Sequence, residues 1–230
     1  MRKTFAALAS CIAFATPVVA DGPVVVELYT SQGCSSCPPA DAMLVDLAAR
    51  SDVLALALHV DYWDYIGWAD TFGSPAFTRR QQQYAHAAGD STIYTPQIVI
   101  AGRDHVIGTK PMEVADLIRR HNAAQTGVQV VAELQGDQLR ITGTSPRPFD
   151  SAAMVQVVRF DPEQIVEIGR GENQGRSIRY ANIVTDWQVV GEWGGREGLD
   201  QTVRLNGNGA VAVIVQTRGP RNILATAVLR

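Results

Sequence analysis

The chain has 230 residues, a hydrophobic content of 46% and a formal net charge of −3. That length fits one large domain or two small ones, and the hydrophobic content excludes wholesale disorder. Near-neutral charge excludes a broad phosphate-neutralising surface, so we expect no nucleic-acid partner. After the first 20 residues no apolar run is long enough to cross a bilayer, so we expect no stable membrane span once they are removed.

The first 20 residues have the pattern of a secretory signal peptide. Arg2 and Lys3 form a short positive region, residues 4–16 are largely apolar, and residues 18–20 end in Ala20 at a cleavage-site pattern. We therefore expect residues 1–20 to be cleaved on export and the protein to be periplasmic or secreted. A buried N-terminal helix is the alternative.

Export gives the cysteines a specific meaning. Cys11 lies within the signal peptide, so the mature chain keeps one pair, Cys34 and Cys37, spaced Cys-x-x-Cys. Disulfides persist in exported proteins because the compartment is oxidising. A bridge across so short a loop gains little stabilisation from chain entropy, which favours redox chemistry or metal binding over a structural role.

The cysteine pair is expected between a strand and a helix. Residues 24–29 are β-branched and apolar, as in a strand, and Pro38 and Pro39 open a helix that ends near Arg50. Residues 53–58 are apolar on both faces, so this order predicts a right-handed βαβ unit with parallel strands. The later pattern predicts helices over 74–88 and 111–121 and strands over 97–100 and 105–107.

From residue 127 onward the pattern changes to short strands separated by turns. The predicted strands cover residues 128–134, 138–142, 154–160, 178–184, 187–193, 202–205, 210–217 and 223–229. Many short strands with regular turns are typical of a β-sandwich, and the boundary between the two halves is expected near residues 123–126.

A Cys-x-x-Cys pair at the start of a helix has a defined mechanism. The unpaired N–H groups and positive partial charge of the helix N-terminus stabilise a thiolate and lower its pKa. Cys34 is therefore the expected nucleophile, and Cys37 is close enough to resolve a mixed disulfide. Ser35 and Ser36 add no charge, so we expect no extreme thiolate pKa.

The order of strand, Cys-x-x-Cys, helix and strand, followed by Tyr94-Thr95-Pro96, resembles the thioredoxin superfamily. Residues 28–34 are more similar to the approach in glutaredoxins. The resemblance implies an α/β thioredoxin-like domain over residues 21–124, with an insertion at 62–77, and the strand pattern predicts a β-sandwich-like domain over 127–230. The resemblance also implies that Pro96 is cis and that Thr95 and Pro96 orient a protein partner, whereas an ordinary turn proline is the alternative.

The chain also resembles a family of exported bacterial thioredoxin-like proteins of unknown function. That similarity is carried by residues 34–37, 59–64 with 67–68, 94–97 and 171–180. It implies fold and export but no substrate. The sequence departs from thioredoxins at one position. Thioredoxins bury an acidic residue six positions before the first cysteine, but this chain has Leu28 there. The adjacent Glu27 is expected to point to the opposite face of the strand.

The aromatic segment, residues 62–77, is expected beside the cysteines. The two parallel strands end at the same sheet edge, where sites of α/β proteins usually lie. The candidate substrate-binding residues are Trp63, Asp64, Trp68 and Tyr94. Alternatively, the tryptophans pack within the insertion, while Asp61 and Asp64 make local turn and capping bonds.

Three functions fit the sequence. The first is an exported thiol–disulfide oxidoreductase that needs no cofactor and acts on an unknown protein thiol or disulfide. The second is a copper-handling, other metal-handling or redox-sensing module in which His59 joins Cys34 and Cys37 as ligands, although a hydrogen-bonded core histidine is the commoner role. The third is a non-catalytic interaction protein that works through its β domain.

One polar loop in the second half carries a weaker signal. Its members are Arg170, Glu172, Asn173, Arg176 and Arg179 among glycines. A solvated, salt-bridged turn is the commoner structure for such a loop, and a site for an anion or partner is the alternative.

Overall fold

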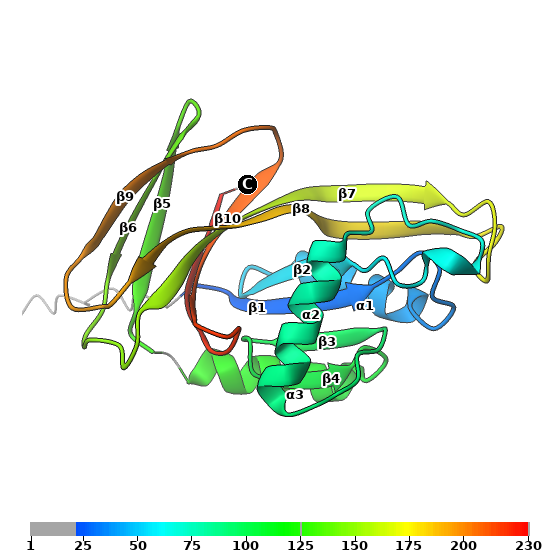
Figure 1. The fold of residues 1–230 in the computed structure, drawn as a ribbon, viewed down its shortest axis with the longest axis horizontal. Helices are drawn as coiled ribbons and strands as arrows, with labels where there is room; N and C mark the ends of the chain where they lie inside the picture. Colours follow the sequence, from blue (N-terminus) through cyan, green and yellow to red (C-terminus); the bar gives the residue numbers. More distant parts are fainter. Residues whose placement is uncertain (1–21, 125, 230) are drawn as a thin grey trace, which may run out of the picture.

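The computed structural model describes residues 22–124 and 126–229 (Figure 1). The expected signal peptide, residues 1–20, lies outside the described residues. The elements are β1 (Val24–Thr30), α1 (Pro38–Ala48), β2 (Val53–His59), the 3-10 helix η1 (Asp64–Ile66), α2 (Pro75–Ala88), β3 (Gln97–Ile100), β4 (Asp104–Ile107), α3 (Pro111–Ala123), β5 (Gln129–Gln135), β6 (Gln138–Thr144), β7 (Ala153–Glu167), β8 (Ser177–Trp193), β9 (Leu199–Arg204), β10 (Ala210–Thr217) and β11 (Ile223–Leu229). Across these ranges, no helix has the length and apolar character needed to cross a membrane.

The fold is mixed α/β, with one large sheet running through it. Eight strands follow the order β11-β10-β7-β8-β2-β1-β3-β4, and β5, β6 and β9 form a separate antiparallel sheet. β1 and β2 pair in parallel, with Val24 opposite Val53, as the sequence predicts, and β3 runs antiparallel to β1. The helix α1 connects β1 to β2, so the cysteines lie at the carboxyl end of β1.

Helices cover both faces of the N-terminal strands. α2 packs on one face through Phe77 and Tyr84, and it crosses in front of the sheet in Figure 1. α1 and α3 pack on the other face through residues such as Leu44 and Ile118. β2 is buried along its whole length, which explains why residues 53–58 are apolar without alternation.

The strands after residue 127 divide between the two sheets. β7, β8, β10 and β11 extend the sheet of the N-terminal strands, because β8 runs parallel to β2 with Ile183 opposite Ala57. The remaining three strands pack against β7 and β10 through Leu139 and Ile141, so only this small sheet lies apart. The proposed boundary at residues 123–126 stays a prediction, but the two halves share one hydrogen-bonded sheet.

Two of the strands that the sequence predicts separately form one continuous strand in the structure. Residues 178–184 and 187–193 lie in the single 17-residue strand β8, and β7 continues past Phe160 to Glu167. Register shifts at Arg159/Phe160 and Val155/Gln156 let these long strands bend without breaking the pairing. The resulting hairpin reaches the end of the molecule opposite the small sheet (Figure 1).

A buried ion pair joins α2 to β1. Arg80 donates from Nε and NH2 to the two carboxylate oxygens of fully buried Glu27, at 2.7 and 3.0 Å. The hydroxyls of Tyr84 and Tyr29 donate to the same carboxylate at 2.6 and 3.0 Å. The guanidinium lies 3.7 Å from the ring centroid of Trp187 on β8, so this pair also links the two halves of the chain.

Replacing the cation of this pair is expected to destabilise the fold. In an Arg80→Met variant, Glu27 keeps its burial but loses its counter-charge, and we expect the free energy of unfolding to fall by about 3–5 kcal/mol. Urea denaturation of the oxidised protein measures it. Arg79→Met, at the exposed neighbouring position, is the matched control and should change the value by less than about 0.5 kcal/mol. Equal stabilities of the two variants would contradict the role given to the pair.

Candidate functional site: the buried cysteine pair

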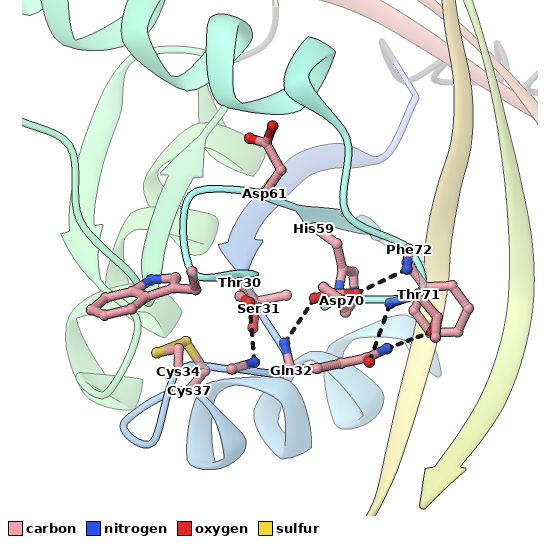
Figure 2. Close-up of polar contacts among 12 residues, drawn as sticks. Thr30, Ser31, Gln32, Cys34, Cys37, His59, Asp61, Asp70, Thr71 and Phe72 are labelled. Carbon is pink, nitrogen blue, oxygen red and sulfur yellow. Dashed lines mark hydrogen bonds and ion pairs between the residues drawn. A yellow bond between two sulfur atoms is a disulfide. The ribbon is translucent and has the colours of Figure 1, made fainter. Parts of the chain in front are cut away.

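The cysteine loop, residues 31–37, leads from β1 into α1. Cys34 and Cys37 form a disulfide with their Cα atoms 5.4 Å apart (Figure 2). Cys37 is the N-cap residue of α1, and Pro38 and Pro39 occupy the first turn. The predicted strand–cysteine–helix arrangement is therefore confirmed. Both cysteines are shielded, because Cys34 is 3% exposed and Cys37 is fully buried.

The predicted proline lies beside the first turn of α1. The Thr95–Pro96 peptide bond is cis, as expected. Gly108 sits between Pro96 and Ala40: a Cβ there would lie 2.9 Å from the Pro96 Cβ and 3.0 Å from the Ala40 Cβ. Only glycine permits this approach, so the close packing of Gly108, which follows β4, against Ala40 of α1 holds Pro96 near the cysteine end of the helix.

The aromatic segment rests on the cysteine loop. The indole N–H of Trp63 donates to Thr95 Oγ1 at 2.7 Å, and that of Trp68 donates to Gln32 Oε1 at 2.8 Å. A Cβ at Gly33 would lie 3.3 Å from the Trp63 Cβ, so the segment is in contact with the loop backbone. Trp63 also stacks on Tyr65, whose side chain is 81% exposed. Trp63 and Trp68 therefore lie at the site.

Asp64 lies within the aromatic segment and Asp61 directly precedes it, and both make hydrogen bonds to nearby residues. Asp64 accepts a hydrogen bond from the Asp70 N–H at 3.0 Å. Asp61 accepts from the Thr78 hydroxyl at 2.5 Å, and Figure 2 shows its carboxylate pointing to α2 and away from the disulfide. Asp61 and Asp64 therefore make the local bonds that were the alternative to a position facing the cysteines. Tyr94 precedes Thr95 and is 38% exposed, so its ring is partly open to solvent.

His59 is paired with a carboxylate. Its Nδ1 lies 2.8 Å from Asp70 Oδ2, with both side chains fully buried (Figure 2). Asp70 also accepts from the backbone N–H groups of Gln32 and Phe72, at 2.7 and 2.9 Å. Burial alone raises the pKa of Asp70, but the His59 ring and these donors outweigh it and hold that pKa below its usual value. The pair therefore links β2 to the cysteine loop.

The metal-site alternative requires His59, Cys34 and Cys37 as ligands, with the cysteines reduced. Over residues 22–124 and 126–229, no three His, Cys, Asp or Glu side chains are grouped as metal ligands. Cys34 and Cys37 are bonded to each other, and the Nδ1 of His59 is engaged by Asp70. His59 thus has the core, hydrogen-bonded role.

Asn173 is a site residue that sequence reasoning missed. The polar loop was expected to be a solvated turn, but Asn173 is 1% exposed. Its Nδ2 donates to the carbonyl oxygens of Gln32 and Cys34, both at 2.9 Å. The loop also packs on the aromatic segment, since a Cβ at Gly169 would lie 3.1 Å from the Trp68 ring. The signal was present in the resemblance, which includes residues 171–173.

Asp41 is the second residue that was missed. It lies in the first turn of α1, where an acidic side chain is usually explained by the helix dipole, yet it is 2% exposed. Thr30 donates to its Oδ1 at 2.8 Å. Burial raises the pKa of Asp41 to about 7, the negative Asp70 adds to this, and His59 and the Thr30 bond oppose it. A buried acid is therefore present although Leu28 packs in an apolar core.

Fold and site together define a mixed α/β protein with a shielded Cys-x-x-Cys disulfide at a strand–helix junction. The chain belongs to the family described as "Protein of unknown function (DUF1223)", whose model matches residues 25–216.

Two solved structures are similar. The crystal structure of protein AGR_C_4864 from Agrobacterium tumefaciens is 35% identical, with a TM-score of 0.77, and the match covers 93% of this chain and 96% of that one. HBP35 of Porphyromonas gingivalis shares the fold at 13% identity and a TM-score of 0.62, over 90% of this chain and 74% of that one. No curated protein matches the chain.

Removing the Asn173 amide is expected to loosen the cysteine loop. An Asn173→Ala variant leaves two buried carbonyl oxygens without that donor, so we expect the free energy of unfolding to fall by about 2–4 kcal/mol. We also expect dithiothreitol to reduce the disulfide faster, because the loop no longer holds Cys34 closed. Gln174→Ala, at the exposed next position, is the control. Unchanged stability and reduction rate would contradict this role.

Asp41 is expected to make stability depend on pH. The pKa of Asp41 is about 7 in the fold against an ordinary value of 3.8, so unfolding between those pH values releases a proton and stability falls as the pH rises. Asp41→Asn removes this contribution. The variant should gain a few kcal/mol (about 1.4 per pKa unit) relative to wild type between about pH 4 and about pH 8. Urea denaturation at both pH values tests this, and a difference that stays constant with pH would refute it.

Proposed function

We propose that this chain is an exported thioredoxin-like thiol–disulfide oxidoreductase. The observation that carries the proposal is the Cys34–Cys37 disulfide at the N-terminus of α1, directly after a buried parallel strand. A helix N-terminus favours a thiolate on Cys34, and Cys37 is the N-cap residue within disulfide reach. In this proposal the N-terminal half is the redox domain and the β-rich remainder supports it.

The proposed reaction exchanges disulfides with a protein partner. When the chain acts as an oxidant, a partner thiolate attacks the Cys34 sulfur, a mixed disulfide forms and Cys37 leaves as a thiolate that takes up a proton. A second partner thiolate then attacks the partner sulfur, releasing the oxidised partner and the reduced Cys34–Cys37 pair. The reverse sequence reduces a partner, and the reduction potential decides which direction prevails.

The proposed partner surface is the exposed end of the aromatic segment. Tyr65 is 81% exposed and stacks on Trp63, which is bonded to Thr95 beside Pro96. Tyr94 adds a second partly exposed ring. Because Trp63 contacts the cysteine loop at Gly33 and Tyr94 directly precedes Thr95, we assign these side chains to contact with an extended segment of the partner on either side of its cysteine.

The experiment is a redox equilibrium followed by trapping. We expect the purified protein, equilibrated in graded glutathione or dithiothreitol buffers, to show a reversible potential between about −120 and −270 mV. A reduced Cys37→Ser variant mixed with a disulfide-linked peptide should accumulate a mixed disulfide, because Cys34 displaces one half of the peptide as a thiolate and no resolving thiol remains. Cys34→Ser should form none.

Two outcomes would contradict the proposal, one for the pair as a whole and one for the order of attack. A pair that resists reduction below about −300 mV behaves as a structural disulfide. A Cys34→Ser protein that traps peptide as well as Cys37→Ser would contradict the order of attack. The first result favours a non-catalytic interaction protein, in which the shielding of Cys34 protects a permanent bridge, whereas the second makes Cys37 the attacking residue of a reactive pair.

A further inference from the structure

Unpartnered buried polar atoms gather around the cysteine pair. Among the described residues, five buried side-chain atoms have no hydrogen-bond partner, and four of them are on residues of this region. Buried polar groups are almost always paired, so a group of exceptions at one place calls for an explanation. The four atoms are Asp41 Oδ2, His59 Nε2, Asn173 Oδ1 and Tyr180 OH.

Three of these residues form one buried cluster. The rings of His59 and Tyr180 are 4.9 Å apart at nearly right angles. His59 acts electrostatically on Asp41, and Asp41 acts on Tyr180, whose pKa is raised by burial and by its two acidic neighbours. The cluster draws on α1, β2 and β8, so it is a product of the whole fold.

Asp41 is placed to exchange a proton with Cys37. The two residues are four apart at the start of α1, and side chains at this spacing lie on the same helix face. The Asp41 N–H donates to the Cys37 carbonyl at 3.1 Å, which fixes this first turn. Thr30 engages Oδ1 and leaves Oδ2 free, while both Cys37 and Asp41 are shielded from solvent.

We propose that Asp41 is the proton acceptor and donor for the Cys37 sulfur, that Thr30 positions it, and that the His59–Asp70 pair acts on it electrostatically. The inference rests on the proposed function and names a group of the same site. The acid is supplied by the helix that follows the cysteines, whereas the strand before them carries Leu28 at the expected place.

The proton balance is closed within the site. In the resolving step, Cys37–SH gives its proton to the Asp41 carboxylate, directly or through one water, and the thiolate attacks the Cys34 sulfur. The Cys34–partner bond breaks, the Cys34–Cys37 bond forms and the partner leaves as a thiolate. In the opposite direction, the Asp41 carboxyl returns the proton to the Cys37 thiolate as the mixed disulfide forms.

The surroundings of Asp41 suit it to this exchange near neutral pH. Its pKa is about 7, and proton transfer is most efficient when the pKa of the acid or base lies near the working pH. His59 favours the carboxylate, Asp70 disfavours it, and the Thr30 hydroxyl favours it. The titratable and charged groups that face Asp41 are Cys37 from its own helix, His59 from β2, Asp70 from the aromatic segment and Tyr180 from β8.

The test separates the two chemical steps in time. The full chain carries Cys11→Ser in every sample, so that only the pair reacts. Reduced protein is mixed with 5,5′-dithiobis(2-nitrobenzoate) in a stopped-flow instrument. Attack by Cys34 releases one nitrothiobenzoate, and resolution by Cys37 releases the second.

We expect Asp41→Asn to slow the second release by at least about tenfold at pH 7 while the first changes less than about twofold. The two proteins should converge above about pH 8.5, where the Cys37 thiol ionises without help. Asp46→Asn, at an exposed position of the same helix, is the control and should match wild type.

The outcomes distinguish the two proposals. Absence of the first release in wild type counts against the oxidoreductase itself. A normal first release with equal second-release rates in wild type and Asp41→Asn from about pH 6 to about pH 8 overturns the role of Asp41 alone.

A second variant covers the case in which Asp41→Asn does not fold. Thr30→Val removes a hydrogen bond that favours the carboxylate, so the pH midpoint of the second release should rise by about one unit. An unmoved midpoint would overturn the assignment.

Discussion

The candidate site depends on the parallel contact between β8 and β2. This contact is short: Ile183 lies opposite Ala57, and next to it the side chain of Asn182 donates to the Ala55 carbonyl at 2.8 Å. Asn182 has a φ of 48°, a left-handed conformation that asparagine tolerates better than most residues. Because the contact fixes β8 beside the N-terminal strands, it brings Tyr180 against His59 and directs the hairpin toward the cysteine loop.

Two buried carboxylates on opposite sides of the sheet show the difference between a structural acid and a reactive one. Glu27 receives hydrogen bonds from Arg80, Tyr84 and Tyr29, so its charge is fully compensated. Asp41 has one donor and a free oxygen, and burial raises its pKa. The first arrangement stabilises the fold. The second costs stability whenever the group is ionised, which is the usual signature of a group retained for function.

The N-terminal half could be predicted from the sequence because its signals are local. The apolar run of β2, the prolines after Cys37 and the Cys-x-x-Cys spacing fix the strand–helix–strand unit and the place of the disulfide. Trp63 and Trp68 could be placed at the site by topology alone, since parallel strands end at one edge.

The second half could not be derived in the same way. Its strands alternate as in a sandwich, and no local pattern says that β8 pairs with β2 or that residues 178–193 form one strand. The burial of Asn173 depends on that pairing, because its partners lie about 140 residues away, at Gln32 and Cys34. Nothing in the sequence singles out Asp41, because an acidic residue in the first turn of a helix is explained by the helix dipole and no local pattern indicates that it is buried.

Burial of the cysteine pair accounts for both its protection and its proposed chemistry. Trp63 bonds Thr95, Asn173 bonds the Cys34 carbonyl, and Cys34 keeps 3% exposure. In the proposed reaction, a partner therefore has to displace part of the aromatic segment, or of the polar loop that carries Asn173, before it reaches the sulfur. The same exclusion of water that shields the disulfide strengthens every electrostatic interaction inside. It is also what lifts the pKa of Asp41 to about 7, so the site that limits access is the site that supplies the proton acceptor.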